Sequence, residues 1–265
     1  MIEVGIESVG VIGPGIGGWR DAEAMLMSPE GFDIGAEHPR RTPARLRANE
    51  RRRVTPLISM VMQCCEDTLS RNRNGGTSMR SVFASSCGDL LIVDRILSDL
   101  TLPGRPLSPT DFHNSVHNAP AAYWSIACGD NSASTSMAAY DSSFSAGFLE
   151  AVGSVKQHGG RTLLVAYDYP PPPPLRAFRP LAAPFAVGLI LGDTPGRWRV
   201  EVTLEETDAF DSMRDPGLEA MRLGNPAARS LPLLERLANK RAGSVKLPYH
   251  ANLAVAIDIA ACADD

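Results

Sequence analysis

The sequence predicts a single layered α/β domain with a mixed β-sheet over residues 1–265. Strand and helix patterns alternate along most of the chain, and consecutive strand patterns follow near its end. Hydrophobic residues make up 44% of the sequence, which is enough to fill a packed core in a chain of this length. This composition excludes a disordered protein.

The first half of the chain carries recognisable helix starts. Thr55 can cap a helix that opens with Pro56, and Ser108 can cap the helical turn after it. Asn118 can cap a helix that ends before Gly129. The expected elements are, in order, a strand over 2–12 ending in a glycine-rich turn, a polar surface excursion over 28–54, a helix from Thr55, a strand over 81–86, a helix from 88, a turn from Ser108 and a helix from Asn118.

The second half opens with a strand of small residues over 133–140 and an amphipathic helix over 142–157. Five consecutive prolines at 170–174 force an extended conformation and exclude helix and central strand, so we interpret them as a stiff internal loop. A proline-rich recognition ligand is the alternative. The remaining expected elements are a strand over 161–167, a hairpin of strands 183–192 and 198–205, a helix over 230–240 and a last strand over 252–260.

Charge and cysteine content exclude several classes of protein. A formal net charge of -4 does not indicate binding to nucleic acid or to an anionic membrane. The N-terminus shows no secretory signal, and the longest apolar run, near 182–192, is too short to span a bilayer. The five cysteines form no metal-like cluster, so we expect a cytoplasmic protein with reduced thiols and without a metal or cofactor. They are Cys64, Cys65, Cys87, Cys128 and Cys262.

Two motifs invite ligand-binding interpretations. "GPGIGG" at 13–18 follows a strand, but no second strand ends in an acid for a ribose, so we interpret it as a glycine turn rather than a dinucleotide site. An arginine-rich segment follows, and it fits either an acidic carrier protein or a solvated surface with internal ion pairs. Its arginines are Arg40, Arg41, Arg45, Arg47, Arg51, Arg52 and Arg53.

Residues 111–129 concentrate aromatic and histidine side chains. His113 and His117 more commonly hydrogen-bond locally than bind a metal, because no third ligand is evident. Large rings bury much area at interfaces and pocket walls. We therefore interpret Phe112, Tyr123 and Trp124 as wall or interface residues.

The stretch "STSMAAYDSSFSAGFLEAV" at 134–152 has the strand–turn–helix pattern that holds a nucleophile in several enzyme families. Asp141, at the turn, could be a carboxylate nucleophile, a helix N-cap or a residue without chemical importance, and the N-cap is the safest interpretation. The helix that follows has an apolar stripe, and Gly147 within it indicates close packing. The stripe consists of Phe144, Phe148, Ala151, Val152 and Val155.

Four segments carry a resemblance to a known family. "SPTDFHNSVHNAPAAYWSIACG" followed by "STSMAAYDSSFSAGFLEA" resembles the N-terminal half of β-ketoacyl synthases. The similarity is closer to the short ketosynthase-like chain-length factors of bacterial aryl polyene clusters. "FASSCGDL" at 83–90 and "LLVAYDYPPPPPLRAF" are also similar to that family. The resemblance implies a thiolase-like half-fold, the N-terminal half of a ketosynthase.

The resemblance also implies that the chain is not catalytic. It aligns Asp141 with the cysteine that carries the acyl chain in a condensing ketosynthase, and a carboxylate cannot replace a thiolate in thioester exchange. The two catalytic histidines belong to a C-terminal half for which this chain has no room. Neither His158 nor His250 stands in a matching context.

A scaffold without chemistry can be retained for association. The resemblance implies a heterodimer with an active ketosynthase, formed near strand 133–140, in which this chain closes the acyl tunnel and limits polyene length. An acyl carrier protein would be a further partner. The expected interface or tunnel-end residues are Phe112, His117, Asn118, Tyr123, Trp124, Met137 and Phe144, and the expected carrier contacts are Arg45, Arg51, Arg52 and Arg53.

Two other classes of function stay open: a stand-alone decarboxylase or hydrolase that uses Asp141, and a carrier-binding scaffold without a role in product length. A half of a two-half fold leaves a broad face uncovered, so we also expect stability mainly in the heterodimer.

Overall fold

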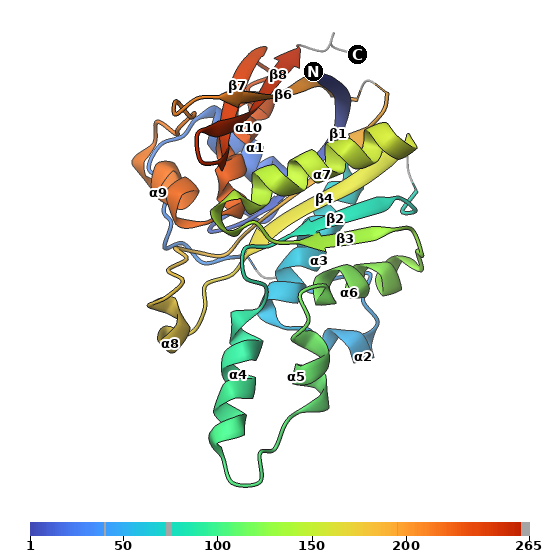
Figure 1. Ribbon diagram of the computed structural model, residues 1–265, viewed down its shortest axis with the longest axis vertical. Coiled ribbons are helices and arrows are strands. Elements are labelled where there is room, and N and C mark those ends of the chain that lie inside the picture. Colours follow the sequence, from blue (N-terminus) through green and yellow to red (C-terminus); the bar gives the residue numbers. More distant parts are fainter. Residues whose placement is uncertain (40, 73–75, 195, 261–265) are drawn as a thin grey trace.

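The computed structural model describes residues 1–39, 41–72, 76–194 and 196–260. Its strands are β1 (Ile2–Ile12), β2 (Arg80–Ala84), β3 (Ser134–Met137), β4 (Arg161–Asp168), β5 (Phe185–Gly192), β6 (Trp198–Glu206), β7 (Gly243–His250) and β8 (Leu253–Ala260). They form one mixed sheet in the order β3-β2-β4-β5-β1-β6-β8-β7 (Figure 1). The predicted α/β fold with a mixed sheet is confirmed.

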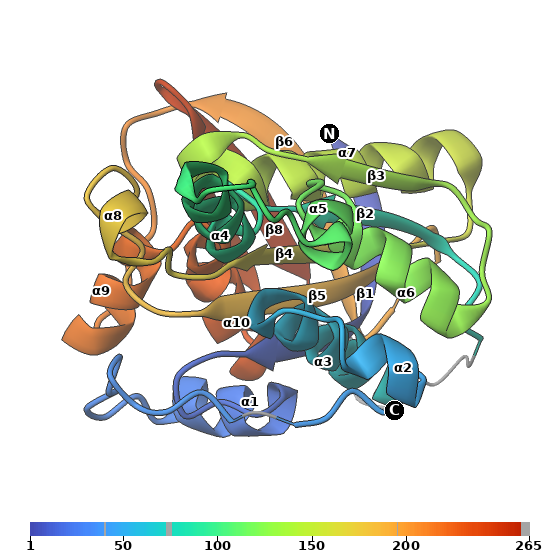
Figure 2. The ribbon, with the colours of Figure 1, turned by 90° about the horizontal axis from the view of Figure 1, so that it is seen from below.

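Helices cover the sheet on both faces. They are α1 (Trp19–Met27), α2 (Ala48–Arg51), α3 (Pro56–Ser70), α4 (Leu90–Thr101), α5 (Pro109–Asn114), α6 (Ala119–Cys128), α7 (Ser143–His158), α8 (Pro173–Arg176), α9 (Pro216–Gly224) and α10 (Leu231–Ala238), with short 3-10 turns η1 (Tyr140–Ser142) and η2 (Ala227–Ser230). Figure 2 shows α7 and α3 on opposite sides of β4 and β5. The helices α1 and α9 and the strand β7 were not predicted.

Two of the three predicted N-cap residues form a capping hydrogen bond through their side chains. The side chain of Thr55 accepts a hydrogen bond from the backbone N–H of Ile58, and Ser108 accepts one from Asp111. Asn118 stands at the N-cap position of α6, but its side chain caps nothing. Gly129 ends α6 in the left-handed conformation, as predicted.

The predicted hairpin of β5 and β6 is wrong, because β1 lies between them. Both strands pair with β1 in antiparallel register, and β1 is buried along most of its length and needs a neighbour on each side. The connection between β5 and β6 passes against the β1 backbone. A Cβ at position 196 would lie 2.5 Å from the carbonyl oxygen of Ile6, so only glycine permits this crossing.

The proline run is also not wholly extended. Its last two residues, Pro173 and Pro174, form the first turn of α8, where a missing N–H costs no hydrogen bond. The exclusion of helix therefore holds only for the residues before them.

The helix α7 buries its apolar stripe against the chain itself. Phe144 and Phe148 are 0% exposed, and a Cβ at Gly147 would lie 2.8 Å from the Cβ of Ala84, which confirms the predicted close packing. The turn η2 and strand β7 pack against α7. The last third of the chain therefore covers part of this helix.

Candidate functional site

Three parallel strands end at the same edge of the sheet. β2 pairs in parallel with both β3 and β4, so the segments after these strands converge there. They bring together Asp168 at the end of β4, Ser85 and Ser86 after β2, and the turn η1 after β3. This edge contains the strand–turn–helix segment that the sequence singles out.

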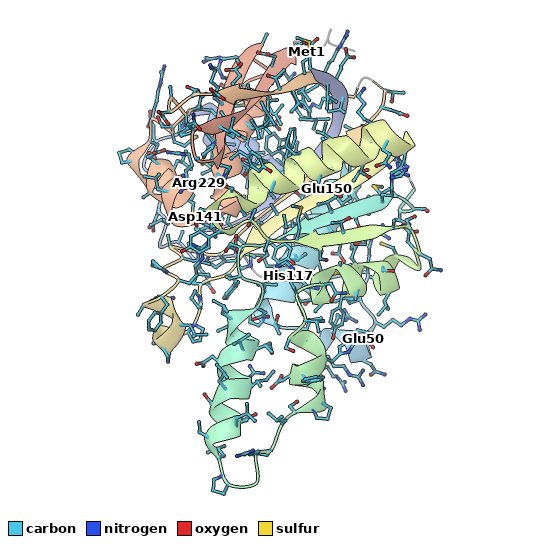
Figure 3. The ribbon with its side chains drawn as sticks, viewed as in Figure 1. Met1, Glu50, His117, Asp141, Glu150 and Arg229 are labelled. Atoms are coloured by element: carbon cyan, nitrogen blue, oxygen red, sulfur yellow. The ribbon has the colours of Figure 1, made fainter. Side chains whose placement is uncertain are left out.

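Asp141 does not cap α7. The helix begins at Ser143, and neither Asp141 nor Ser142 donates or accepts a capping bond through its side chain. Instead, the Oδ1 atom of Asp141 accepts a hydrogen bond of 2.7 Å from Nη1 of Arg179. The N-cap interpretation is wrong because a guanidinium from the segment after α8 competes for the carboxylate. Figure 3 shows that Asp141 lies on the side of the molecule where Arg229 also lies.

Arg179 is the centre of this polar cluster. Its side chain is only 11% exposed, and its Cζ atom lies 3.9 Å from the centroid of the Tyr140 ring. Nε and Nη2 are buried without a hydrogen bond of ordinary geometry among the described residues. Burial raises the pKa of Asp168 and of Cys87, and the charge of Arg179 offsets part of that rise. No sequence signal marked this arginine.

Asp168 is fully buried beside that charge. Its Oδ1 atom accepts hydrogen bonds from the Ser85 hydroxyl at 3.1 Å, the Ser86 hydroxyl at 2.7 Å and the Ser86 N–H at 2.9 Å. Oδ2 has no hydrogen-bond partner within the described part of the chain. Burial raises the pKa of Asp168 to about 6, although the Ser86 and Ser85 hydrogen bonds and Arg179 lower it.

The raised pKa predicts that acidification stabilises the fold at this position. The folded pKa lies above the unfolded value of about 3.9, so the folded state binds the proton more tightly. Relative to Asp168→Asn, the wild-type chain should gain about 1 kcal/mol of unfolding free energy between pH 7 and pH 5. Urea unfolding at both pH values measures this difference. Parallel pH profiles for the two proteins would contradict it.

Within the described part of the chain, the thiol of this cluster is not an activated one. Cys87 is the cysteine next to Asp168, and burial and then the Asp168 charge raise the pKa of its thiol, so it stays protonated at neutral pH. His117 contacts the Ser85 carbonyl oxygen at 3.2 Å through Nε2. In residues 1–39, 41–72, 76–194 and 196–260, no group of three His, Cys, Asp or Glu side chains could hold a metal ion.

A second feature is an exposed apolar surface next to this edge. The helices α4 and α5 project from the body (Figure 1), and α6 packs against α3 and β2, the neighbour of the edge strand β3. Only Ile92 of the twelve residues of α4 is buried. We call the exposed large side chains of this region the α4–α6 surface: Leu97, Leu100, Leu102, Leu107, Phe112, Val116 and Ile126.

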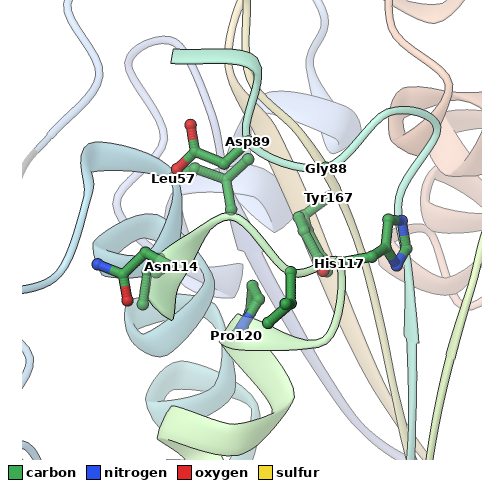
Figure 4. A pocket seen from close by; sticks show the side chains of 9 residues that line it. Leu57, Gly88, Asp89, Asn114, His117, Pro120 and Tyr167 are labelled. Atoms are coloured by element: carbon green, nitrogen blue, oxygen red, sulfur yellow. The ribbon is translucent and has the colours of Figure 1, made fainter. Parts of the chain in front are cut away.

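A narrow crevice lies beneath this surface (Figure 4). It is too narrow to admit a water molecule, so it is not a substrate pocket in this conformation. Its lining residues are Leu57, Ile58, Gly88, Asp89, Asn114, Val116, His117, Pro120 and Tyr167.

The comparison with protein families decides the relationship. Residues 27–250 match the model of the β-ketoacyl synthase N-terminal domain. The chain belongs to the β-ketoacyl synthase family. No curated protein sequence matches this ketosynthase-family chain.

Solved structures similar to this ketosynthase-family chain show the same fold. One is the ketosynthase ApeO in complex with its chain length factor ApeC from Xenorhabdus doucetiae, with 19% identity, coverage of 97% of this chain and 100% of that chain, and a TM-score of 0.76. Another is the ishigamide ketosynthase/chain length factor, with 12% identity, 98% and 99% coverage and a TM-score of 0.71. A third is AntDE:AntF, a type II polyketide synthase acyl-carrier protein in complex with its ketosynthase bound to the hexaketide, with 9% identity, 98% and 99% coverage and a TM-score of 0.74. The predicted thiolase-like half-fold is confirmed.

The predicted interface residues of this ketosynthase-family chain divide into two groups. Tyr123, Trp124 and Phe144 are at most 5% exposed and pack in the chain's own core, and their predicted role at the tunnel end or the subunit interface stays a prediction. The Tyr123 hydroxyl donates to Oδ1 of Asn114 inside that core. The sequence alone does not distinguish an aromatic side chain that faces inward from one that faces outward.

The second group lies at or near the surface. Phe112 is 67% exposed, Asn118 is exposed, and His117 and Met137 are half-buried. The role of these four residues stays a prediction. Most of the α4–α6 surface was missed, although the apolar run of α4 in the sequence could have indicated it.

The predicted carrier-contact arginines are all exposed. Arg51 belongs to the short helix α2, in which no residue is buried, and Arg45, Arg52 and Arg53 flank it. Arg53 pairs with Glu50 at 3.8 Å, so part of the segment makes internal ion pairs. Arg40 lies outside the described residues. No helix among those described is long and apolar enough to cross a membrane.

Proposed function

We propose that this chain is a non-catalytic chain-length factor that pairs with an active ketosynthase in the cytoplasm and closes the acyl tunnel during aryl polyene synthesis. The observation that carries the proposal is the turn after β3, where Asp141, the residue that the resemblance aligns with the ketosynthase cysteine, forms an ion pair with Arg179. We further propose that residues 1–265 act as one domain.

The state of Asp141 argues against a stand-alone enzyme. A carboxylate that accepts a charge-assisted hydrogen bond at 2.7 Å is a weakened nucleophile, because its negative charge is stabilised in the ground state. No histidine has a hydrogen bond to Asp141 among the described residues. An aspartyl intermediate or a decarboxylation that starts from Asp141 is therefore disfavoured.

The edge of the sheet supports association. β3 pairs only with β2, so its other side presents backbone N–H and C=O groups, within the part of the chain that the structure describes. Small side chains such as Ser134 and Ser136 leave room for a neighbouring strand. A strand of the ketosynthase subunit would complete these hydrogen bonds.

The α4–α6 surface supports a protein partner that covers apolar area. Large exposed apolar side chains are normally isolated on a soluble monomer, but here several occur on α4, α5, α6 and the segments that join them. Ile126 lies on α6, which packs beside β2, the neighbour of β3. The surface and the edge strand therefore offer neighbouring contacts for one partner.

The similar structures support the same assignment by what their names describe, namely ketosynthases with chain length factors and a ketosynthase with its acyl-carrier protein. The exposed Arg45, Arg51, Arg52 and Arg53 suit the acidic surface of a carrier protein. They are also what favours a second candidate, a carrier-binding scaffold that does not influence product length.

Replacement of Phe112 tests the chain-length role. If the tunnel ends at this chain, Phe112→Ala removes volume at its end and the polyene should gain at least one condensation. Each added double bond moves the absorption to longer wavelength, so chromatography, absorption and mass of the product from co-expression with the ketosynthase measure the change.

Two variants serve as controls. Phe178 is 84% exposed on the segment after α8, and Phe178→Ala should leave the product unchanged. Trp124→Ala should instead reduce stability, by about 3–5 kcal/mol, because the ring is buried. An unchanged polyene from an intact Phe112→Ala complex, with carrier binding retained, would favour the scaffold.

A further inference from the structure

Tyr140 combines large exposure with an unusual backbone conformation. The residue is 61% exposed and lies three positions after the end of β3. Its φ angle is 49°, in the left-handed region that a bulky residue rarely occupies. Such a conformation persists only where the surrounding structure enforces it, and it is concentrated at functional sites.

The contacts that enforce this conformation involve two parts of the chain, the start of α7 and the strand β7. The Ser143 hydroxyl donates to the Tyr140 carbonyl oxygen at 2.7 Å and accepts from the Ala139 N–H at 3.0 Å. The Ser142 hydroxyl donates to the carbonyl oxygen of Tyr249 in β7. The turn is therefore held both to its own helix and to the far edge strand.

Arg179 also holds the Tyr140 ring in place, through a contact with one face of it. The guanidinium of Arg179 lies 3.9 Å from the ring centroid and is itself held by Asp141 at 2.7 Å. Because Arg179 is nearly buried and Tyr140 is mostly exposed, the arginine supports one face of the ring and leaves the rest of it open. An exposed aromatic side chain fixed before binding loses little entropy when a partner covers it.

We propose that Tyr140 is an anchor residue for the ketosynthase subunit, and that Arg179 and Asp141 are positioning residues that hold its ring in the binding orientation. This inference rests on the proposed function, because the partner is the same subunit. It assigns to the ion pair at the nucleophile position a role in association. Tyrosine is among the residues that most often dominate interface energies.

The test measures the affinity of the wild-type chain and of single variants for an active ketosynthase that is co-expressed with them. Tyr140→Ala should weaken binding about 30-fold or more, and Tyr140→Phe should stay within about 3-fold. Tyr140→Gly relieves the left-handed backbone, so it should raise or preserve the melting temperature and still lose affinity. Leu223→Ala, at a 56% exposed position on α9, is the control and should bind as wild type.

A double-mutant cycle tests the positioning role. Arg179→Met should weaken binding about 10-fold in the wild-type background and have no further effect when residue 140 is alanine. Asp141→Asn should act in the same direction, by a smaller factor. If the single variant Arg179→Met, in which Tyr140 is intact, binds the ketosynthase as tightly as the wild type, Arg179 does not position the ring.

Two results overturn the inference and are distinguishable. If wild type binds the ketosynthase and Tyr140→Ala binds equally well, Tyr140 is not an anchor, and the proposed function stands. If the wild-type chain does not bind the ketosynthase at all, the proposed function fails and the inference fails with it.

Discussion

The isolated chain is expected to form no acyl-enzyme and to elongate no acyl group. Asp141, in its ion pair with Arg179, stands where the resemblance places the ketosynthase cysteine, and a carboxylate there cannot take an acyl group as a thioester. The remaining described cysteines do not replace it. Burial raises the pKa of the Cys64 and Cys65 thiols well above the ordinary value, and it also raises the pKa of the Cys87 and Cys128 thiols. Thiolates are therefore scarce at neutral pH.

Incubation with radiolabelled acyl- and malonyl-carrier proteins measures this expectation. Labelling and product should be at least about 10⁴-fold below those of the ketosynthase subunit under the same conditions. The ketosynthase alone is the positive control for labelling, and the mixture is the control for assembly. An acyl adduct mapped by mass spectrometry to any residue of this chain would show that it has chemistry of its own.

Gly147→Ala should destabilise the fold, whereas Gly153→Ala in the same helix should stabilise it. A Cβ at 147 would lie 2.8 Å from the Cβ of Ala84 and 3.1 Å from Cδ1 of Leu164, so β2, β4 or α7 must shift. Overpacking of this kind costs about 1–3 kcal/mol. At Gly153 no atom lies within 4 Å of the added carbon, so the gain in helix propensity of about 1 kcal/mol is retained.

Chemical unfolding measures the unfolding free energy of the two variants. Both carry the same substitution in the same helix, so only the surroundings of the two positions differ. The predicted difference between them is about 2–4 kcal/mol, with opposite signs relative to wild type. Gly147→Leu should prevent folding altogether. Equal stabilities for the two alanine variants would show that α7 can move away from the sheet more easily than its packing indicates.

Local patterns were enough to predict several parts of this protein. The mixed α/β fold, most strands, the starts of α3 and α5, the core stripe of α7 and the close packing at Gly147 follow from residue spacing and capping chemistry. The resemblance of residues 108–151 to ketosynthases was likewise present in the sequence alone. These features depend on residues that lie a few positions apart in the same segment, so the sequence of that segment is enough to predict them.

Tertiary structure alone decided the features that join distant segments. It placed β1 between β5 and β6, turned Tyr123 and Trp124 into the core while Phe112 stayed exposed, and packed the last third of the chain against part of α7. It also moved Asp141 from a predicted helix cap to an ion pair. The physical reason is that capping is a choice among nearby partners, and Arg179, 38 residues later in the chain, offers the carboxylate a full positive charge that only folding brings within reach.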